Sequence, residues 1–166
     1  FKKLKDNGGK ILALNPLPET GLMKFRDPQT VKGVLGMSAD LTDEYMQVRL
    51  DGDRAFFQAL NKELIRRDAL DHKFLDQFCS GVEDTIAHLN SLDDATLLRG
   101  CGLTAKDIQK AADMVEDADT VVVSWTLGVT QHKNAVYTIR EMVNFLLLTG
   151  NIGKPGAGTA PLRGHS

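Results

Sequence analysis

Two segments of the chain repeat apolar residues with the period of an amphipathic helix, one from 53 to about 67 and one over about 134–148. Apolar side chains recur there at spacings of three and four residues, which predicts helices with one buried face. Thr104 with Asp107 is typical of a capping arrangement, in which an acid replaces the usual Glu or Gln. Further helices are predicted over 1–7, 73–78, 82–91, 94–99 and 108–115.

Three short apolar runs predict β-strands, over 10–14, 45–50 and 119–124. The last run is apolar enough to be buried on both faces, as strands of parallel sheets are. Because strands alternate with helices, we expect an α/β fold: a three-layer, Rossmann-like domain with a mainly parallel sheet. Three strands are few for such a sheet, so we expect its first strand to be missing from this sequence.

Composition narrows the class of protein. A chain of 166 residues suits one domain with a single core, and a net charge of −2 argues against a general nucleic-acid binder. No apolar run approaches the length of a membrane span, and no signal peptide opens the chain, so we expect a cytoplasmic protein without membrane contact. Cys79 and Cys101 lack metal-binding spacing. Because the chain begins at Phe1 and ends inside a glycine-rich motif, we interpret residues 1–166 as one domain of a longer polypeptide.

The end of the chain, from Val121 to Ser166, contains a strand, a polar turn over 125–132, a helix and a glycine-rich tail. A β-branched strand that leads into a glycine-containing turn at a helix N-terminus presents free backbone N–H groups to anionic cofactors. The turn and the tail lie at opposite ends of one helix. They would therefore line the same cleft only if the tail folds back.

Three motifs of this region carry a specific resemblance: the segments 124–131, 147–158 and 161–164. They read SWTLGVTQ, LLTGNIGKPGAG and PLRG, in that order. Together they resemble the molybdopterin oxidoreductase family, and within it formate dehydrogenase alpha subunits and formate-dehydrogenase-like proteins. The likeness is strong after Thr120 and weaker before Leu103.

The resemblance implies that the turn contacts a pterin-guanine dinucleotide through Leu127, Gly128 and Gln131, next to Trp125. Gly128 permits close approach of a ligand or a positive φ, and Gln131 both donates and accepts hydrogen bonds toward a heterocycle. The residues alone also fit a plain strand-to-helix turn with a buried tryptophan.

Arg163 is the candidate substrate-binding residue. A planar guanidinium holds a carboxylate by two parallel hydrogen bonds, and in formate dehydrogenases the arginine of this motif lies above the metal and orients formate. Gly164 would let the backbone pass close to the cofactor. At the next position, His165 provides an imidazole where formate dehydrogenases commonly have an amide side chain, and this difference puts formate in doubt as the substrate. His165 would relay protons or tune the pterin, or it would serve as a hydrogen-bonding spacer.

Two upstream residues, Asn15 and Asp53, follow predicted strands where Rossmann-like domains recognise ribose and base. An acid at Asp53 would accept from the N1 and exocyclic amine of guanine, although Asp53 also fits a simple helix cap. Cations that would balance pyrophosphate charge are Arg49, Lys133 and Lys154.

The resemblance therefore implies a domain of an enzyme that oxidises formate or another small substrate. The implied cofactor is bis-molybdopterin guanine dinucleotide (bis-MGD) with molybdenum or tungsten. A 4Fe-4S cluster and the metal ligand would lie in the remaining domains of the parent protein, because no cysteine cluster motif occurs in these residues. Two alternatives stay open: an NAD-type nucleotide-binding domain, which lacks its Gly-x-Gly-x-x-Gly motif here, and a non-catalytic α/β interaction module.

Overall fold

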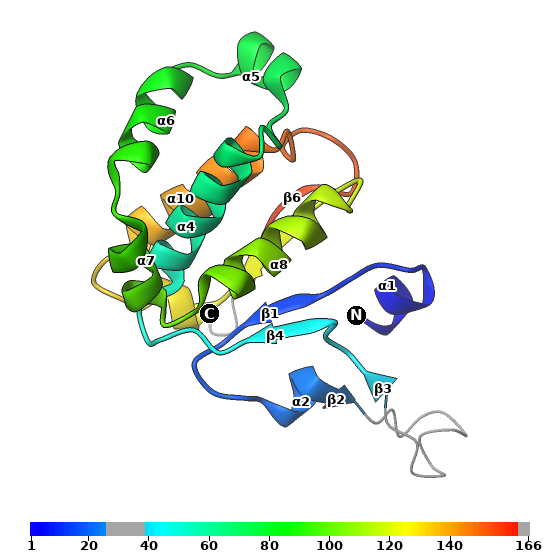
Figure 1. Cartoon of the computed structure of the whole chain (residues 1–166). Helices are drawn as coiled ribbons and strands as arrows, with labels where there is room; N and C mark the ends of the chain where they lie inside the picture. Colours follow the sequence, from blue (N-terminus) through cyan, green and yellow to red (C-terminus); the bar gives the residue numbers. More distant parts are fainter. Residues whose placement is uncertain (26–38, 163–166) are drawn as a thin grey trace. The chain divides into compact units, whose positions relative to one another are not determined.

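The computed structural model describes residues 1–25 and 39–162, and the chain divides into two compact units, Phe1–Val48 and Arg49–Ser166. The predicted single domain over 1–166 stays a prediction. Figure 1 shows the elements of both units.

The first unit is built on one parallel strand pair. β1 (Leu12–Leu14) pairs with β4 (Glu44–Met46), so that Ala13 lies opposite Tyr45. The predicted strand over 45–50 is shorter and earlier than expected, because the Val48 N–H turns back to the Met46 carbonyl at 3.0 Å. The other elements of this unit are α1 (Lys2–Asp6), α2 (Thr20–Met23) and an antiparallel pair of β2 (Lys24–Phe25) with β3 (Ala39–Asp40).

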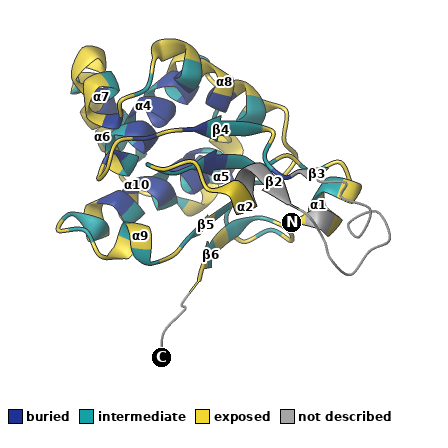
Figure 2. Ribbon diagram, turned by 90° about the horizontal axis from the view of Figure 1, so that it is seen from below, coloured by how far each residue is buried: buried dark blue, intermediate teal, exposed yellow. Residues whose placement is uncertain are grey.

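The second unit is organised around α4 (Asp53–Arg66), which also contacts α6 (Val82–Ser91) and packs most extensively against three other helices. These are α7 (Asp94–Cys101), α8 (Ala105–Glu116) and α10 (Ala135–Leu148). Figure 2 shows buried residues along α4 and α10, which confirms the one-sided burial expected from their apolar periodicity. The buried apolar side chains contributed by α4 and α10 are Phe56, Phe57, Ala59, Leu60, Leu64, Met142, Phe145, Leu146 and Leu148.

Local signals at the helix ends are confirmed. Thr104 caps α8, and its side chain and that of Asp107 bond each other's backbone N–H groups in a capping box. Gly150 follows α10 with a φ of 62°, the left-handed conformation expected just past a helix end. The two shorter helices α5 (His72–Phe78) and α6 (Val82–Ser91) also match their predicted ranges.

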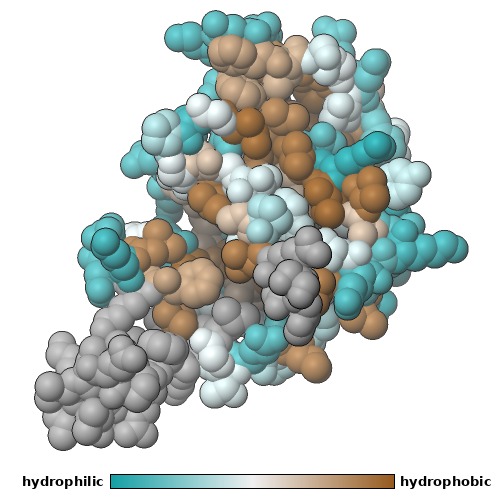
Figure 3. All heavy atoms as spheres, turned by 180° about the vertical axis from the view of Figure 1, so that it is seen from behind, coloured by the Kyte–Doolittle hydropathy of each residue, from teal (hydrophilic) through white to brown (hydrophobic). Residues whose placement is uncertain are grey.

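A second parallel pair joins β5 (Val122–Trp125) to β6 (Gly158–Pro161). The tail after α10 therefore folds back, and the α/β class with parallel pairing is confirmed. β6 itself was not predicted. The expectation that the β5 segment is buried on both faces is wrong: Val122 is 52% exposed, because among the described strands only β6 pairs with β5. Figure 3 shows apolar groups that reach the surface among polar ones.

Candidate functional site

The carboxyl ends of β5 and β6 lie side by side and define one edge of the strand pair. Trp125 is opposite Pro161, and the Leu162 N–H donates to the Trp125 carbonyl at 2.8 Å. Because β5 and β6 are parallel, the segments that follow them both leave at this carboxyl-terminal edge, and open α/β sheets bind their ligands there. The polar turn after Trp125 and the tail up to Leu162 therefore meet at one place, as a shared cleft requires.

The turn after β5 forms a short helix, α9 (Leu127–Thr130), with Thr126 at its N-cap. The N–H groups of Val129 and Thr130 bond the Thr126 carbonyl, and Thr126 makes no side-chain cap. The N–H groups of Leu127 and Gly128 have no acceptor within residues 1–25 and 39–162. Unsatisfied N–H groups of this kind attract an anion.

Gly128 leaves open space beside these donors. A Cβ built at this position has no neighbouring heavy atom within 4 Å. Its φ is not among the positive ones, so a left-handed conformation does not explain the glycine, and close approach of a ligand stays a prediction. Trp125 and Leu127 are half-buried, whereas Gly128 and Gln131 are exposed.

The second unit also brings Asp53 close to this turn. His132, the residue after Gln131, has its Nδ1 3.7 Å from Oδ1 of Asp51, and it is close enough to Asp53 to influence the pKa of that carboxyl. Burial raises the pKa of the Asp53 carboxyl above its ordinary value, and Asp51 acts in the same direction, whereas His132 opposes it. The site thus joins a half-buried acid from the start of α4 to the turn before α10.

The loop that carries Asp53 is closely packed. Gly52 is the N-cap of α4, without a side-chain cap, so the alternative that Asp53 is the cap is wrong; Asp53 is the first helical residue. A Cβ at Gly52 would lie 2.8 Å from the Arg49 carbonyl oxygen, and Asp51 has a positive φ of 60°. A non-glycine residue in this conformation is strained, which is common at functional sites.

Asn15 belongs to the first unit and lies directly after β1, as expected. Its N–H donates to the Met46 carbonyl at 3.3 Å, and its own carbonyl accepts from the Tyr45 hydroxyl at 3.3 Å. Its side-chain oxygen accepts from the Leu17 N–H at a long 3.5 Å. The side chain therefore keeps most of its hydrogen-bonding capacity for a ligand.

The remaining sequence candidates have different outcomes. Arg163, Gly164 and His165 lie outside the described residues, and their roles stay predictions. The stem of Arg49 covers Gly102, where a Cβ would lie 2.5 Å from Arg49 Cγ. Lys154 donates to the Asp119 carbonyl at 3.3 Å, at the opposite edge of the strand pair.

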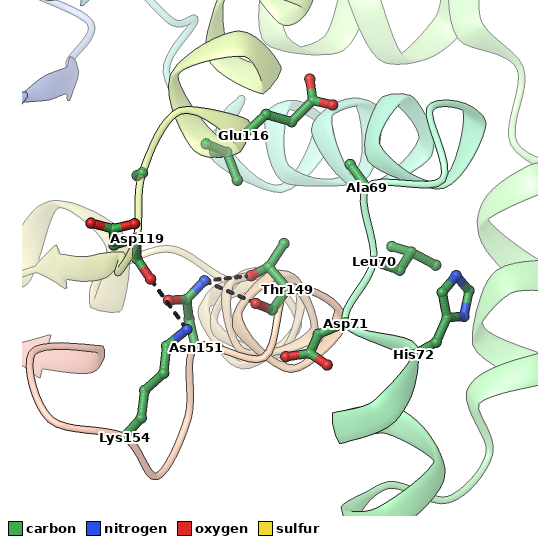
Figure 4. A pocket seen from close by; sticks show the side chains of 11 residues that line it. Ala69, Leu70, Asp71, His72, Glu116, Asp119, Thr149, Asn151 and Lys154 are labelled. Atoms are coloured by element: carbon green, nitrogen blue, oxygen red, sulfur yellow. Dashed lines mark hydrogen bonds between the residues drawn. The ribbon is translucent and has the colours of Figure 1, made fainter.

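That opposite, amino-terminal edge holds a cleft of about 670 Å³ (Figure 4). Asn151 lies there with its amide fully engaged: it accepts from the Val121 N–H and donates to the carbonyl and hydroxyl oxygens of Thr149. The acids Asp71, Glu116 and Asp119 outnumber Lys154, so the cleft does not suit an anionic nucleotide.

Two site residues, Asp51 and His132, were not singled out in the sequence. Their signal was the Asp-Gly-Asp loop before a helix and the position of His132 next to Gln131. Within the described part of the chain, no cluster of three or more His, Cys, Asp or Glu residues would hold a metal ion. No described helix is long and apolar enough to cross a bilayer.

Comparison with known proteins defines the class: this is an α/β domain homologous to oxidoreductases. The chain is 42% identical over 170 residues to an uncharacterized oxidoreductase of Mycobacterium tuberculosis, which covers 99% of this chain and 22% of that protein. It is 34% identical over 177 residues to protein YdeP of Escherichia coli, covering 100% of the chain and 23% of YdeP. No protein-family model matches the chain.

Two further relatives have more specific names. The Bacillus subtilis protein named "Putative formate dehydrogenase YrhE" is 34% identical over 128 residues, 77% of this chain and 13% of that protein. Acetylene hydratase from Pelobacter acetylenicus shares the fold, with a TM-score of 0.73 and 21% identity over 94% of this chain and 19% of that chain. The resemblance to the molybdopterin oxidoreductase family, with formate-dehydrogenase-like relatives, is thereby confirmed. The chain spans about a fifth of the length of the first curated relatives (22% of each).

Proposed function

We propose that this chain binds the guanine end of one molybdopterin guanine dinucleotide in a formate-dehydrogenase-like oxidoreductase. The parent enzyme would oxidise formate, or another small substrate, by two electrons. One observation carries this proposal: the parallel pairing of β5 with β6 brings the turn over 125–132 and the segment that precedes Arg163 to one edge.

The residues at this edge fit the proposed cofactor. The N–H groups of Leu127 and Gly128, which have no acceptor in the described part of the chain, suit a pyrophosphate, and the open space beside Gly128 admits it closely. Asp53 suits the donor edge of guanine, since its carboxylate accepts hydrogen bonds from N1 and the exocyclic amine. When bound, the bis-MGD metal would accept the two electrons from the substrate.

Arg163 would hold the substrate. A fork of parallel N–H groups suits a carboxylate such as formate, and its fixed charge would stabilise negative charge in the transition state. His165 would provide a proton relay next to the pterin. The remaining domains of the parent protein would provide the second half of the cofactor cage, the metal ligand and the 4Fe-4S cluster.

The test is to purify the complete polypeptide, measure its metal and pterin content, and assay formate-dependent dye reduction. For Arg163→Ala we expect turnover to fall by at least about two orders of magnitude, the scale of removing one oriented charge-stabilising donor. Arg163→Lys is the matched control, because it keeps the charge and loses the planar fork; it should recover only part of the activity. A fully active enzyme without pterin and metal would overturn the proposal.

Nucleotide preference distinguishes the alternative of an NAD-type domain. We expect cofactor-free protein to bind GDP more tightly than NADH, because Asp53 recognises guanine. Preference for NADH would favour an ordinary dehydrogenase, and binding of neither nucleotide would favour a non-catalytic interaction module.

A further inference from the structure

The interface between α4 and α10 contains a buried polar cluster that the proposed chemistry does not use. Gln58 and Asn61 extend from α4, and Glu141 extends from α10. The Gln58 side-chain amide donates to Glu141 Oε1 at 2.9 Å, and the Asn61 amide donates to the backbone carbonyl of Glu141 at 3.4 Å. Asn61 is 0% exposed and Glu141 is 9% exposed, so both lie among the apolar residues of the core.

This cluster is only partly satisfied. Asn61 Oδ1 and Glu141 Oε2 are buried and have no hydrogen-bond partner among the residues that the structure describes. No cation of the described residues forms an ion pair with Glu141. Buried acceptors without donors lower stability, and an apolar pair of similar volume is often more stable. Stabilisation of the core therefore does not explain why these polar residues are buried.

The place of the cluster offers another explanation. Asp53 is the first residue of α4, and Gln58 lies five residues later, about 7.5 Å along the helix axis. α10 begins at Ala135, just after His132, and Glu141 lies six residues later, about 9 Å along its axis. The cluster thus joins the two helices between one and about two and a half turns from the ends that carry the nucleotide site.

We propose that Gln58, Asn61 and Glu141 are positioning residues for this site. Apolar faces tolerate sliding of one helix along the other, whereas hydrogen bonds fix one register. By fixing α4 against α10, the cluster sets the spacing between Asp53 and the Gln131–His132 turn. This inference rests on the proposed function, because the spacing matters only if both ends hold one nucleotide.

The experiment compares three variants of the complete polypeptide. The double variant Asn61→Leu with Glu141→Met removes the polar contacts and keeps similar volumes. Glu141→Gln keeps an acceptor for Gln58 and places an amide N–H group where the unpartnered carboxylate oxygen Oε2 lies. Glu83→Gln makes the same chemical change at an exposed position on α6 and is the control. The readouts are the melting temperature, GDP affinity of cofactor-free protein and the NMR shift of the His132 imidazole.

For the apolar double variant we expect an unchanged or higher melting temperature, by about 2–4 °C. Its GDP affinity should fall at least about tenfold, a loss of about 1.4 kcal/mol, and the His132 shift should move. Glu141→Gln should melt higher than wild type, with wild-type GDP affinity and His132 shift. Wild-type GDP affinity in the double variant would overturn the inference, as would a Glu141→Gln protein that melts lower and binds GDP more weakly.

Two further outcomes separate this inference from the proposed function. Should the double variant fail to fold, Gln58→Leu decides instead, because it removes the hydrogen bond to Glu141 Oε1 from a half-buried position. Wild-type GDP affinity and an unmoved His132 shift in Gln58→Leu would then contradict the positioning role. Should wild-type protein bind no GDP, the proposed function fails. In that case a moved His132 shift in the double variant still supports the positioning role, and an unmoved shift contradicts it.

Discussion

Replacing Gly128 with alanine separates folding from cofactor binding at the proposed site. Gly128 lies in α9 without a positive φ, and a Cβ there meets no heavy atom within 4 Å. The methyl group therefore enters open space and strains nothing. Because glycine disfavours helices by roughly 0.5–1 kcal/mol relative to alanine, Gly128→Ala should melt at or slightly above the wild-type temperature.

Cofactor binding should respond in the opposite direction. A pyrophosphate oxygen that accepts from the Gly128 N–H must approach through the space beside the Cα, where the new methyl would lie. Loss of one hydrogen bond to a charged group costs about 1.5–3 kcal/mol, which is a decrease in affinity of about 10- to 150-fold. We therefore expect purified Gly128→Ala protein to contain much less pterin and metal than wild type.

Two other glycines provide controls. Gly21 lies in the four-residue helix α2 and also has no heavy atom within 4 Å of a built Cβ, so Gly21→Ala should load cofactor normally. Gly150 has a φ of 62°, and a Cβ there would lie 2.3 Å from Asp71 Oδ2, so Gly150→Ala should melt lower. The measurements are melting temperature and pterin and metal content. A stable Gly128→Ala protein with the full wild-type cofactor content would refute close approach at this turn.

Three further predictions concern Asp53, Thr104 and Asp107. Because the folded protein raises the pKa of Asp53, this carboxyl contributes stability below its pKa in the unfolded chain, near 3.9, and the contribution is lost as pH rises through the folded-state pKa. Asp53→Asn should therefore melt at or above the wild-type temperature at pH 7. Its affinity for GDP, measured by titration calorimetry, should be at least about tenfold weaker. Thr104→Ala removes the α8 cap and should cost about 1 kcal/mol, measured by urea unfolding. Hydrogen bonds from Thr104 lower the pKa of Asp107. The contribution of Asp107 to stability is therefore present above its pKa in the unfolded chain and is lost as pH falls through the lower folded-state pKa. In melting curves from pH 7 to pH 2, the melting temperature of Asp107→Asn should fall less than that of the wild type.

The long helices were predictable because their signals are local. The apolar repeats predicted α4 and α10 within a few residues, and the pair Thr104 and Asp107 predicted the start of α8. Gly150 likewise marked the end of α10. Caps and helical periodicity depend on neighbours within one or two turns, so the sequence contains nearly all of the information.

The strands were harder because their pairing is not local. β6 begins only ten residues after the end of α10, inside a glycine-rich stretch that has no strand pattern. This segment forms a strand because β5 provides hydrogen-bond partners for its backbone, with Val122 opposite Gly158. The exposure of Val122 has the same origin, since burial of a strand depends on neighbours that its own residues do not specify.

The site shows the same division between local and tertiary information. The donors at Leu127 and Gly128 follow from a strand that runs into a short helix, and the motif made them recognisable. The approach of His132 to Asp51 joins residues that are far apart in sequence, so only the packing of α4 against α10 reveals it. Cleft volume would have been a misleading guide, because the 670 Å³ cleft lies at the amino-terminal edge with three acids. Free donors, open space and a half-buried acid at the opposite edge are the features that an anionic guanine nucleotide requires.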